Sequence, residues 1–337
     1  LNNVERNERR PRIIRPRINY MEIFDEIDFR KRFRISKNNF MTVLERIEDE
    51  IRHKSDRNNP IPPVIQLLVA IRFYATGSYL ITVADFCGIS ESSAQRIVHR
   101  VSPIIAALNN EFIKLPMSAE QIHQNQKEFF QIAKFINVIG CVDCTHIKVE
   151  SCGGRENELY RNRKGFFSLN IQVVVNARLE IIDIVARWPG STHDATIFDH
   201  SRIKNLFEAG TFGDGLLLAD SGYPNLPYVM SPLHYPITPP EHLYNEAQIR
   251  TRSIVERFFG IWKERFAVLS IGMRFQTIEK VLPIIMATAV LHNIVQQNIQ
   301  QDRIDPHAYN NAVAVMQNID NRNVHDKRRA IVEYFGW

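Results

Sequence analysis

Two aspartates interrupt apolar segments of the chain, where a charge is costly. Asp143 lies inside the apolar stretch 135–149, and Asp220 closes the run 215–220. Burying a carboxylate destabilises a fold strongly unless the group is paired with a cation or bound to a metal. These positions therefore indicate a site. The alternative is that each aspartate caps a turn or pairs with an arginine, since Asp-Ser-Gly is common in turns.

A third acid, Glu256, lies on a predicted helix over residues 245–269. Apolar residues recur three or four positions apart along it, as expected for one buried face: Val255, Phe258, Trp262, Phe266 and Leu269. Glu256 borders this face, so it can reach carboxylates on neighbouring strands. The alternative is an i,i+4 ion pair with Arg252, which stabilises a helix only slightly.

Together, two strand aspartates and a helix glutamate are what a two-metal phosphoryl-transfer site needs. Oxygen ligands suit hard divalent cations such as Mg²⁺ or Mn²⁺. Two such ions activate the attacking oxygen and stabilise the leaving one. The acids therefore predict a divalent cation as cofactor.

A cluster of cysteines offers a competing metal site. Cys141 and Cys144 have the spacing of zinc ligands, and His146 and Cys152 lie nearby. The surrounding sequence, however, predicts a buried strand, on which residues 141 and 144 point to opposite faces. We therefore expect no zinc site here. Four cysteines in 337 residues also argue against a disulfide framework and for a reducing compartment.

Composition indicates a globular protein with a mildly basic balance. Hydrophobic residues make up 45% of the chain, and 42 Lys and Arg against 37 Asp and Glu give a net charge of +5. The longest apolar run, 281–291, is too short to span a bilayer, so we expect no membrane. Residues 1–17 carry six arginines, which suits a solvated tail, a phosphate-binding arm or a nuclear-import patch. We expect a nuclear location, with the cytoplasm as a second compartment.

The N-terminal part is predicted to be helical. Helices over 38–51 and 64–75 precede a pair of helices joined at Gly88 and Ser90, within residues 81–101, which is the outline of a helix-turn-helix. The second helix of the pair exposes polar residues that suit DNA contacts, among them Arg96, His99 and Arg100. An ordinary helical bundle with a polar outer face is the alternative.

The second half alternates strands and helices. We predict strands over 135–149, 168–175, 181–188 and 215–220, and helices over 194–207, 245–269, 278–298 and 326–334, with a proline-rich loop over 224–240. This order predicts an α/β fold, with a mixed sheet flanked by helices.

The spacing of the acids and the segments around them resemble those of a known protein family. Asp220 and Glu256 are separated by 35 residues. Together with the segments 140–147, 160–165, 188–194 and 252–260, this interval resembles the DDE transposases of the PIF/Harbinger superfamily, including the domesticated Harbinger transposase-derived nucleases.

The resemblance implies a ribonuclease-H-like core, cleavage of DNA phosphodiesters, and transfer of strands by a 3′-OH in an active transposase. It assigns Asp143, Asp220 and Glu256 as catalytic metal ligands and Asp194 as a further ligand. Asp194 could equally be an early-helix residue favoured by the helix dipole. The implied domains are a basic arm (1–35), a helix-turn-helix-like domain (36–115), a connector (116–134), the nuclease domain (135–299) and a polar tail (300–337).

The sequence also suggests which molecules this protein binds. DNA is the expected substrate, and Arg161, Arg163 and Lys164 are candidates to bind its phosphates, unless they form a solvated loop. The resemblance also implies a separate Myb-like DNA-binding protein, and a homodimer is left open.

Two residues depart from the family pattern, Cys144 in place of Gly and Asn176 in place of Asp. They leave room for a non-catalytic DNA-binding or interaction protein. A metal phosphoesterase acting on a small substrate is a third hypothesis.

Overall fold

A computed structural model describes residues 16–55, 59–151, 157–275, 277–299, 309–310, 312–313 and 327–336. Residues 1–15 of the basic arm, Cys152 and most of the polar tail lie outside these residues. The chain divides into two units, one made of residues 1–73 and 78–101, the other of residues 74–77 and 102–337. The domain boundaries drawn from the sequence remain a prediction.

The first unit is helical. Its helices are α1 (Tyr20–Ile23), α2 (Glu26–Phe33), α3 (Lys37–Ile51), most of α4 (Pro63–Thr76), α5 (Leu80–Cys87) and the first part of α6 (Glu91–Ala107). Aromatic rings build much of its core, where Phe29 lies 5.6 Å from Phe40 edge to face. The hydroxyl of Tyr20 donates to the carbonyl of Phe86 at 2.7 Å and ties α1 to α5.

The predicted pair of helices is present as α5 and α6. Gly88 ends α5 in the left-handed region, with φ of 68°, a conformation that glycine adopts without strain. The Ser90 hydroxyl accepts from the amide of Ser93 and caps α6. The expected stripe of α6 is buried, namely Ala94, Ile97, Val98 and Val101. The DNA-binding role of this pair remains a prediction.

A mixed sheet forms the centre of the second unit. Its strands are β1 (Val138–Lys148), β2 (Ser168–Val175), β3 (Ile181–Pro189), β4 (Leu216–Leu218) and β5 (Val229–Met230), in the order β3-β2-β1-β4-β5. β2 is antiparallel to β1 and β3, whereas β4 is parallel to β1 and β5. This confirms the mixed α/β fold and agrees with the ribonuclease-H-like core that the resemblance implies.

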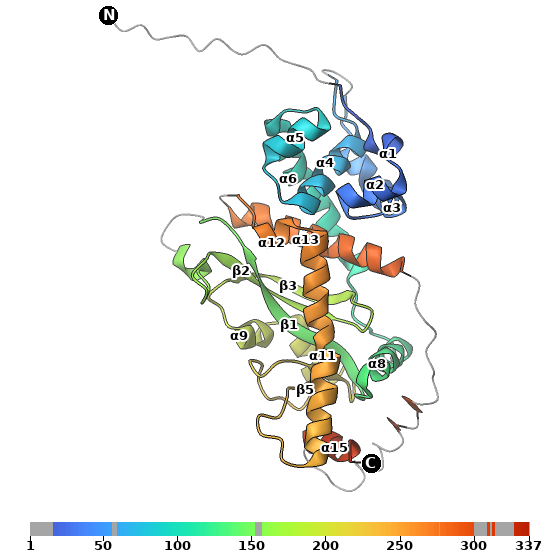
Figure 1. The fold of residues 1–337 in the computed structure, drawn as a ribbon, viewed down its shortest axis with the longest axis vertical. Helices are drawn as coiled ribbons and strands as arrows, with labels where there is room; N and C mark the ends of the chain where they lie inside the picture. The colour runs from blue at the N-terminus through green and yellow to red at the C-terminus, as the bar shows by residue number, and fades with distance from the viewer. Residues whose placement is uncertain are drawn as a thin grey trace, which may run out of the picture. The chain divides into compact units, whose positions relative to one another are not determined.

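Helices cover both faces of the sheet (Figure 1). One face packs on α9 (Asp194–Asp199) and α10 (Arg202–Glu208) through a cluster that includes Val142, Phe198 and Phe207. Cys141, the neighbour of Val142 on β1, donates to the Thr251 carbonyl of α11 (Pro239–Arg265) at 3.6 Å. Since side chains alternate along a strand, α11 lies on the opposite face.

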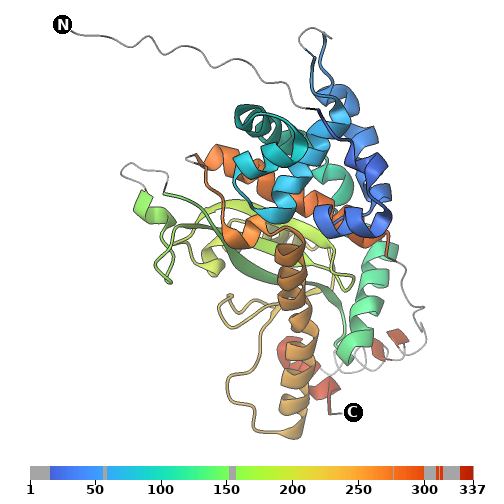
Figure 2. The ribbon, with the colours of Figure 1, turned by 45° about the horizontal axis from the view of Figure 1, so that its top comes forward.

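The remaining helices surround this core. They are α7 (Asn109–Phe112), α8 (Ala119–Ala133), the 3-10 helix η1 (Asn157–Tyr160), α12 (Val268–Ile271), α13 (Ile278–Gln297) and α15 (Lys327–Tyr334). α15 packs beside the start of α11, where the rings of Tyr244 and Phe335 lie 6.3 Å apart (Figure 2).

The main differences from the predicted elements concern one split helix, one additional strand and the bounds of α11. The helix expected over 194–207 breaks at Ser201, whose hydroxyl caps α10 by accepting from the Lys204 amide. The short strand β5 lies in the stretch expected to be an irregular loop. α11 begins six residues earlier than expected, at Pro239, because Thr238 and Glu241 form a capping box. It also ends earlier, at Arg265, so that Leu269 lies in the separate helix α12.

α13 is the one helix in the described part of the chain that is long and apolar enough to cross a membrane, by length and composition alone. It packs instead against β3 and α7. Of its most apolar window, 67% is buried within the fold, so its composition is explained by its place in the core.

Candidate active site

The sheet brings the two predicted strand aspartates together. In the parallel pairing of β1 with β4, Cys141 lies opposite Leu218. Two residues further along each chain, the same register places Asp143 beside Asp220, on strands about 4.8 Å apart. Asp220 follows the end of β4, and its Oδ1 accepts from the Gly222 amide at 2.9 Å. The two carboxylates therefore lie side by side at one end of the sheet.

Asp143 lies in a strained electrostatic environment. Its side chain is 18% exposed, and burial raises the pKa of its carboxyl to about 6. The charges of Asp220 and Asp194 act in the same direction, whereas the Cys144 amide, which donates to Asp143 Oδ1 at 2.7 Å, and Arg252 oppose them. A bound cation would relieve this accumulation of negative charge.

Three residues on successive turns of α11 face this end of the sheet. Gln248 donates to the carbonyls of Ala219 and Met230, at 2.9 and 3.0 Å, and so fixes α11 beside the residue that precedes Asp220. One turn later, Arg252 lies 3.8 Å from Asp143 Oδ2 and 2.8 Å from Glu256 Oε1. Arg252 therefore links Asp143 to Glu256. Its pair with Glu256 is the one the sequence offered as an alternative.

The donor chemistry of this group fits a hard divalent cation. Within the described residues, no three or more His, Cys, Asp or Glu side chains are grouped so as to hold one metal ion. Mg²⁺ does not require such a cage, because it commonly takes one or two carboxylates and completes its shell with water and substrate phosphates. Asp143 and Asp220 can supply this pair. Glu256 would have to exchange its contact with Arg252 for one with the ion.

Asp194 lies on the other side of β1. It begins α9, and its Oδ1 accepts from Asn170 at 2.8 Å. Asn170 pairs with His146 across β1 and β2, and Cys144 is near enough for its pKa to be raised by Asp194 as well as by burial. The structure therefore places Asp194 at the same end of the sheet as Asp143, among residues that face α9.

A lysine that the sequence did not single out lies along the same helix. Lys263 of α11 donates to Thr145 Oγ1 at 2.5 Å and to the His146 carbonyl at 3.1 Å. Burial lowers the pKa of Lys263, and the nearby charge of Lys164 lowers it further. Only its spacing, seven residues after Glu256 on one helix, could have indicated this position in advance.

The basic loop after β1 divides into structural and available residues. Arg161 pairs with Glu158 at 2.7 Å, donates to the Gly165 carbonyl and stacks on Phe167, so it holds the loop together. Arg163 contacts His193, and Lys164 is exposed. Both lie close enough to His146 to contribute to lowering its pKa, which burial lowers most.

The predicted DNA-binding residues of α6 also divide into exposed residues and residues with structural contacts. Arg96 is exposed. Arg100 donates to the Ile51 carbonyl at the end of α3, which ties the two helices together, and His99 is half-buried. Arg96 is therefore the residue of the three best placed to meet a ligand of this unit.

The two departures from the family pattern have different surroundings. The Sγ of Cys144 lies 3.3 Å from the Tyr223 hydroxyl, on the opposite face from Asp143. Asn176 closes the β2–β3 hairpin: it donates to Glu180 Oε2 at 2.6 Å and accepts from the amides of Arg178 and Glu180. Cys144 thus adjoins the acids, whereas Asn176 serves the hairpin.

Comparison with known proteins identifies relatives over most of the chain. A family model described as DDE superfamily endonuclease matches residues 142–293. The human protein named "Putative nuclease HARBI1" is 35% identical over 254 residues, which cover 75% of this chain and 72% of that protein.

The Xenopus laevis protein of the same name is 31% identical over 259 residues, which cover 76% of this chain and 74% of that one. The Arabidopsis thaliana protein named "Protein ALP1-like" is 24% identical over 292 residues, which cover 80% and 71%. No solved structure matches.

Proposed function

Because the chain belongs to the Harbinger-derived DDE nucleases, we propose that it is a metal-dependent DNA endonuclease that cleaves phosphodiesters by in-line attack of water. The observation that carries this proposal is the placement of Asp143 beside Asp220 on parallel strands, with Glu256 one helical turn from the arginine that contacts Asp143. If the protein is an active transposase, a liberated 3′-OH would attack target DNA in the same site.

Asp143, Asp220 and Glu256 would hold the divalent cations, with Asp194 as a further ligand. When bound, Mg²⁺ or Mn²⁺ supplies the charge that activates the water and stabilises the departing 3′-oxygen. Asp143 must be ionised to serve as a ligand. Without a cation, Arg252 lies between Asp143 and Glu256 and offsets their charge, and Glu256 would leave this contact to reach the ion.

DNA would reach the acids past basic residues. Arg163 and Lys164 are exposed near His146 and suit contacts with backbone phosphates. Gln248 positions α11, and Lys263 holds the end of β1 against that helix. Binding and orientation of the DNA are thus assigned to side chains distinct from those that hold the cation.

A plasmid-nicking assay tests the proposal. The protein is incubated with supercoiled DNA and Mg²⁺, Mn²⁺ or EDTA. We expect nicking with a divalent cation and loss of at least about a hundredfold in Asp143→Asn, Asp220→Asn and Glu256→Gln, as is common when charge stabilisation of a transition state is removed. Glu264→Gln, which changes an exposed acid of the same helix, is the matched control. Nicking that persists in EDTA would contradict the mechanism.

A non-catalytic DNA-binding protein is the second candidate. It is favoured by the contacts of Arg252, which already occupy Asp143 and Glu256. It requires salt-sensitive DNA binding in EDTA without nicking under any cation. Nuclear location and a Myb-like partner belong to both proposals, and co-purification with tagged candidate partners from nuclei would test them.

A further inference from the structure

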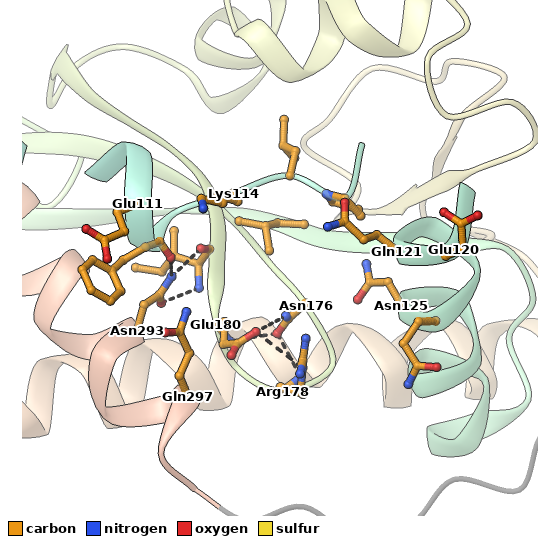
Figure 3. A pocket seen from close by; sticks show the side chains of 16 residues that line it. Glu111, Lys114, Glu120, Gln121, Asn125, Asn176, Arg178, Glu180, Asn293 and Gln297 are labelled. Atoms are coloured by element: carbon orange, nitrogen blue, oxygen red, sulfur yellow. Dashed lines mark hydrogen bonds and ion pairs between the residues drawn. The ribbon is translucent and has the colours of Figure 1, made fainter. Parts of the chain in front are cut away.

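A groove borders the open edge of the central sheet. β3 is the outermost strand, and its residues 182–187 line a cavity of about 1050 Å³ whose other walls come from α7, the segment 113–117 that follows it, α10 and α13. A second cavity of about 520 Å³ adjoins it at Lys114, Leu115, Gln121 and Ile182. Figure 3 shows Lys114 and Gln121 along one side of this second cavity, across from the hairpin residues Asn176, Arg178 and Glu180.

The edge of β3 offers what an added strand requires. A strand at the edge of a sheet presents backbone N–H and C=O groups on its outer side, and an extended peptide can pair with them. Apolar side chains line the same groove, including Ile113, which follows α7, and Leu282 and Met286 from α13. These would receive alternate side chains of the peptide.

The charges of the groove specify its occupant. Lys114, Arg187 and Arg202 are exposed along it, so acidic side chains would be attracted. Asp183 lies among them, and its Oδ2 is buried without a hydrogen-bond partner. Because the last torsion of an aspartate is soft, a small rotation would present this oxygen to a donor in the groove. Burial raises the pKa of Asp183 to about 6, although Arg202 opposes this.

We propose that this groove binds an extended, acidic segment of a partner protein, which adds a sixth strand beside β3. The carboxylates of the segment face Lys114, Arg187 and Arg202, and one of its N–H or hydroxyl groups donates to Asp183. This surface lies apart from the acids of the candidate active site and does not depend on the proposed nuclease function.

Two other occupants fit less well. The backbone of a DNA strand has no N–H group to donate to Asp183 or to pair with the outer edge of β3. A second copy of the chain, paired edge to edge about a twofold axis, would set the basic side chains of one groove against the same side chains of the other. An acidic peptide satisfies both the backbone and the charges.

The test uses the full-length protein and a fluorescein-labelled peptide of alternating valine and glutamate, roughly eight residues long to match ~3.3 Å per residue along β3. Binding is measured by fluorescence anisotropy, and hydrogen exchange reports protection of the β3 residues 182–187. Two matched peptides serve as controls: one has lysine in place of glutamate, and one has N-methyl groups on alternate amides, which blocks strand pairing without changing charge.

We expect the glutamate peptide to bind and to slow exchange of the β3 amides. Affinity should fall by about tenfold in an Arg187→Glu, Arg202→Glu double variant, as is typical of lost charge complementarity. Arg329→Glu, an exposed charge reversal on α15, should bind like the unsubstituted protein. Circular dichroism confirms that each variant is folded, and plasmid nicking or DNA binding should be unchanged.

Three outcomes would overturn the proposal. The first is failure of the glutamate peptide to bind. The second is equal binding of the N-methylated peptide, which would exclude strand addition. The third is evidence for another occupant. Displacement of the bound peptide by duplex DNA would assign the groove to nucleic acid, and a shift to dimer in light scattering that the double variant abolishes would assign it to a second copy.

Discussion

At the scale of single residues, the site depends on acids that the sequence could identify and on contacts that it could not. Asp143 and Asp220 stood out because a charge interrupts an apolar run. The pair of Arg252 with Glu256 also follows from their spacing on one helix. The second contact of Arg252, with Asp143, depends on where α11 crosses β1, and no local pattern encodes that crossing.

The raised pKa of Asp143 leads to a stability prediction. Its pKa in the fold is about 6 against an ordinary value of 3.8, so its favourable contribution is full below about pH 4 and is lost as the pH rises through about 6. In EDTA at pH 7, Asp143→Asn should therefore raise the free energy of unfolding, by an amount on the order of 1–3 kcal/mol. Urea unfolding as a function of pH measures this.

The exposed Asp199 is the control for this experiment. Its pKa is lowered by Lys204, so Asp199→Asn should not stabilise the protein at pH 7. A loss of stability in Asp143→Asn at that pH would show that the Asp143 carboxylate is not under electrostatic strain.

At the scale of elements, long segments with a clear period were predictable, and short ones were not. The strands at 168–175 and 181–189 match their apolar runs closely. β5 has two residues, and it pairs because it lies beside β4, not because of its own sequence. The anchoring of the β2–β3 hairpin by α13 could not be predicted either, because Asn293 contacts Ile181, which lies 112 positions earlier in the chain.

Asn293 holds both this hairpin and the end of α7. Its side chain accepts from the Ile181 amide at 2.9 Å and donates to the carbonyls of Ile181 and Phe112. Asn293→Ala leaves these buried groups without partners, so it should lower the free energy of unfolding by about 2–4 kcal/mol. Chemical denaturation measures the loss. Gln297→Ala, one turn later and exposed, should change stability by less than about 0.5 kcal/mol.

At the scale of the whole molecule, the net charge of +5 is modest, but basic residues are concentrated locally in the fold. Composition alone permitted a nucleic-acid partner without requiring one. Folding gathers Arg163, Lys164 and Lys263 around His146, although Lys263 lies about a hundred residues further along the chain. Charge patterns along the sequence could not reveal that grouping.

DNA binding by the full chain should therefore depend steeply on salt. Affinity for a duplex is expected to fall by at least about tenfold between roughly 50 and 200 mM NaCl. An Arg163→Ala, Lys164→Ala double variant should bind more weakly and reduce the slope of log affinity against log salt by about 1–2. Titrations at several salt concentrations measure both, with Lys280→Ala, an exposed lysine of α13, as control. An unchanged slope would exclude these two residues from phosphate contacts.

Gln248 carries a consequence for relatives of this protein. It belongs to none of the acidic motifs, yet its two hydrogen bonds decide where Glu256 stands along the sheet. Substitution of this glutamine in a relative would remove the anchor of the helix, although every acid of the motif would still be present. An inventory of carboxylates in a newly found homologue is then an incomplete guide to whether that copy still cuts, and the amide two turns upstream of its glutamate should be inspected as well.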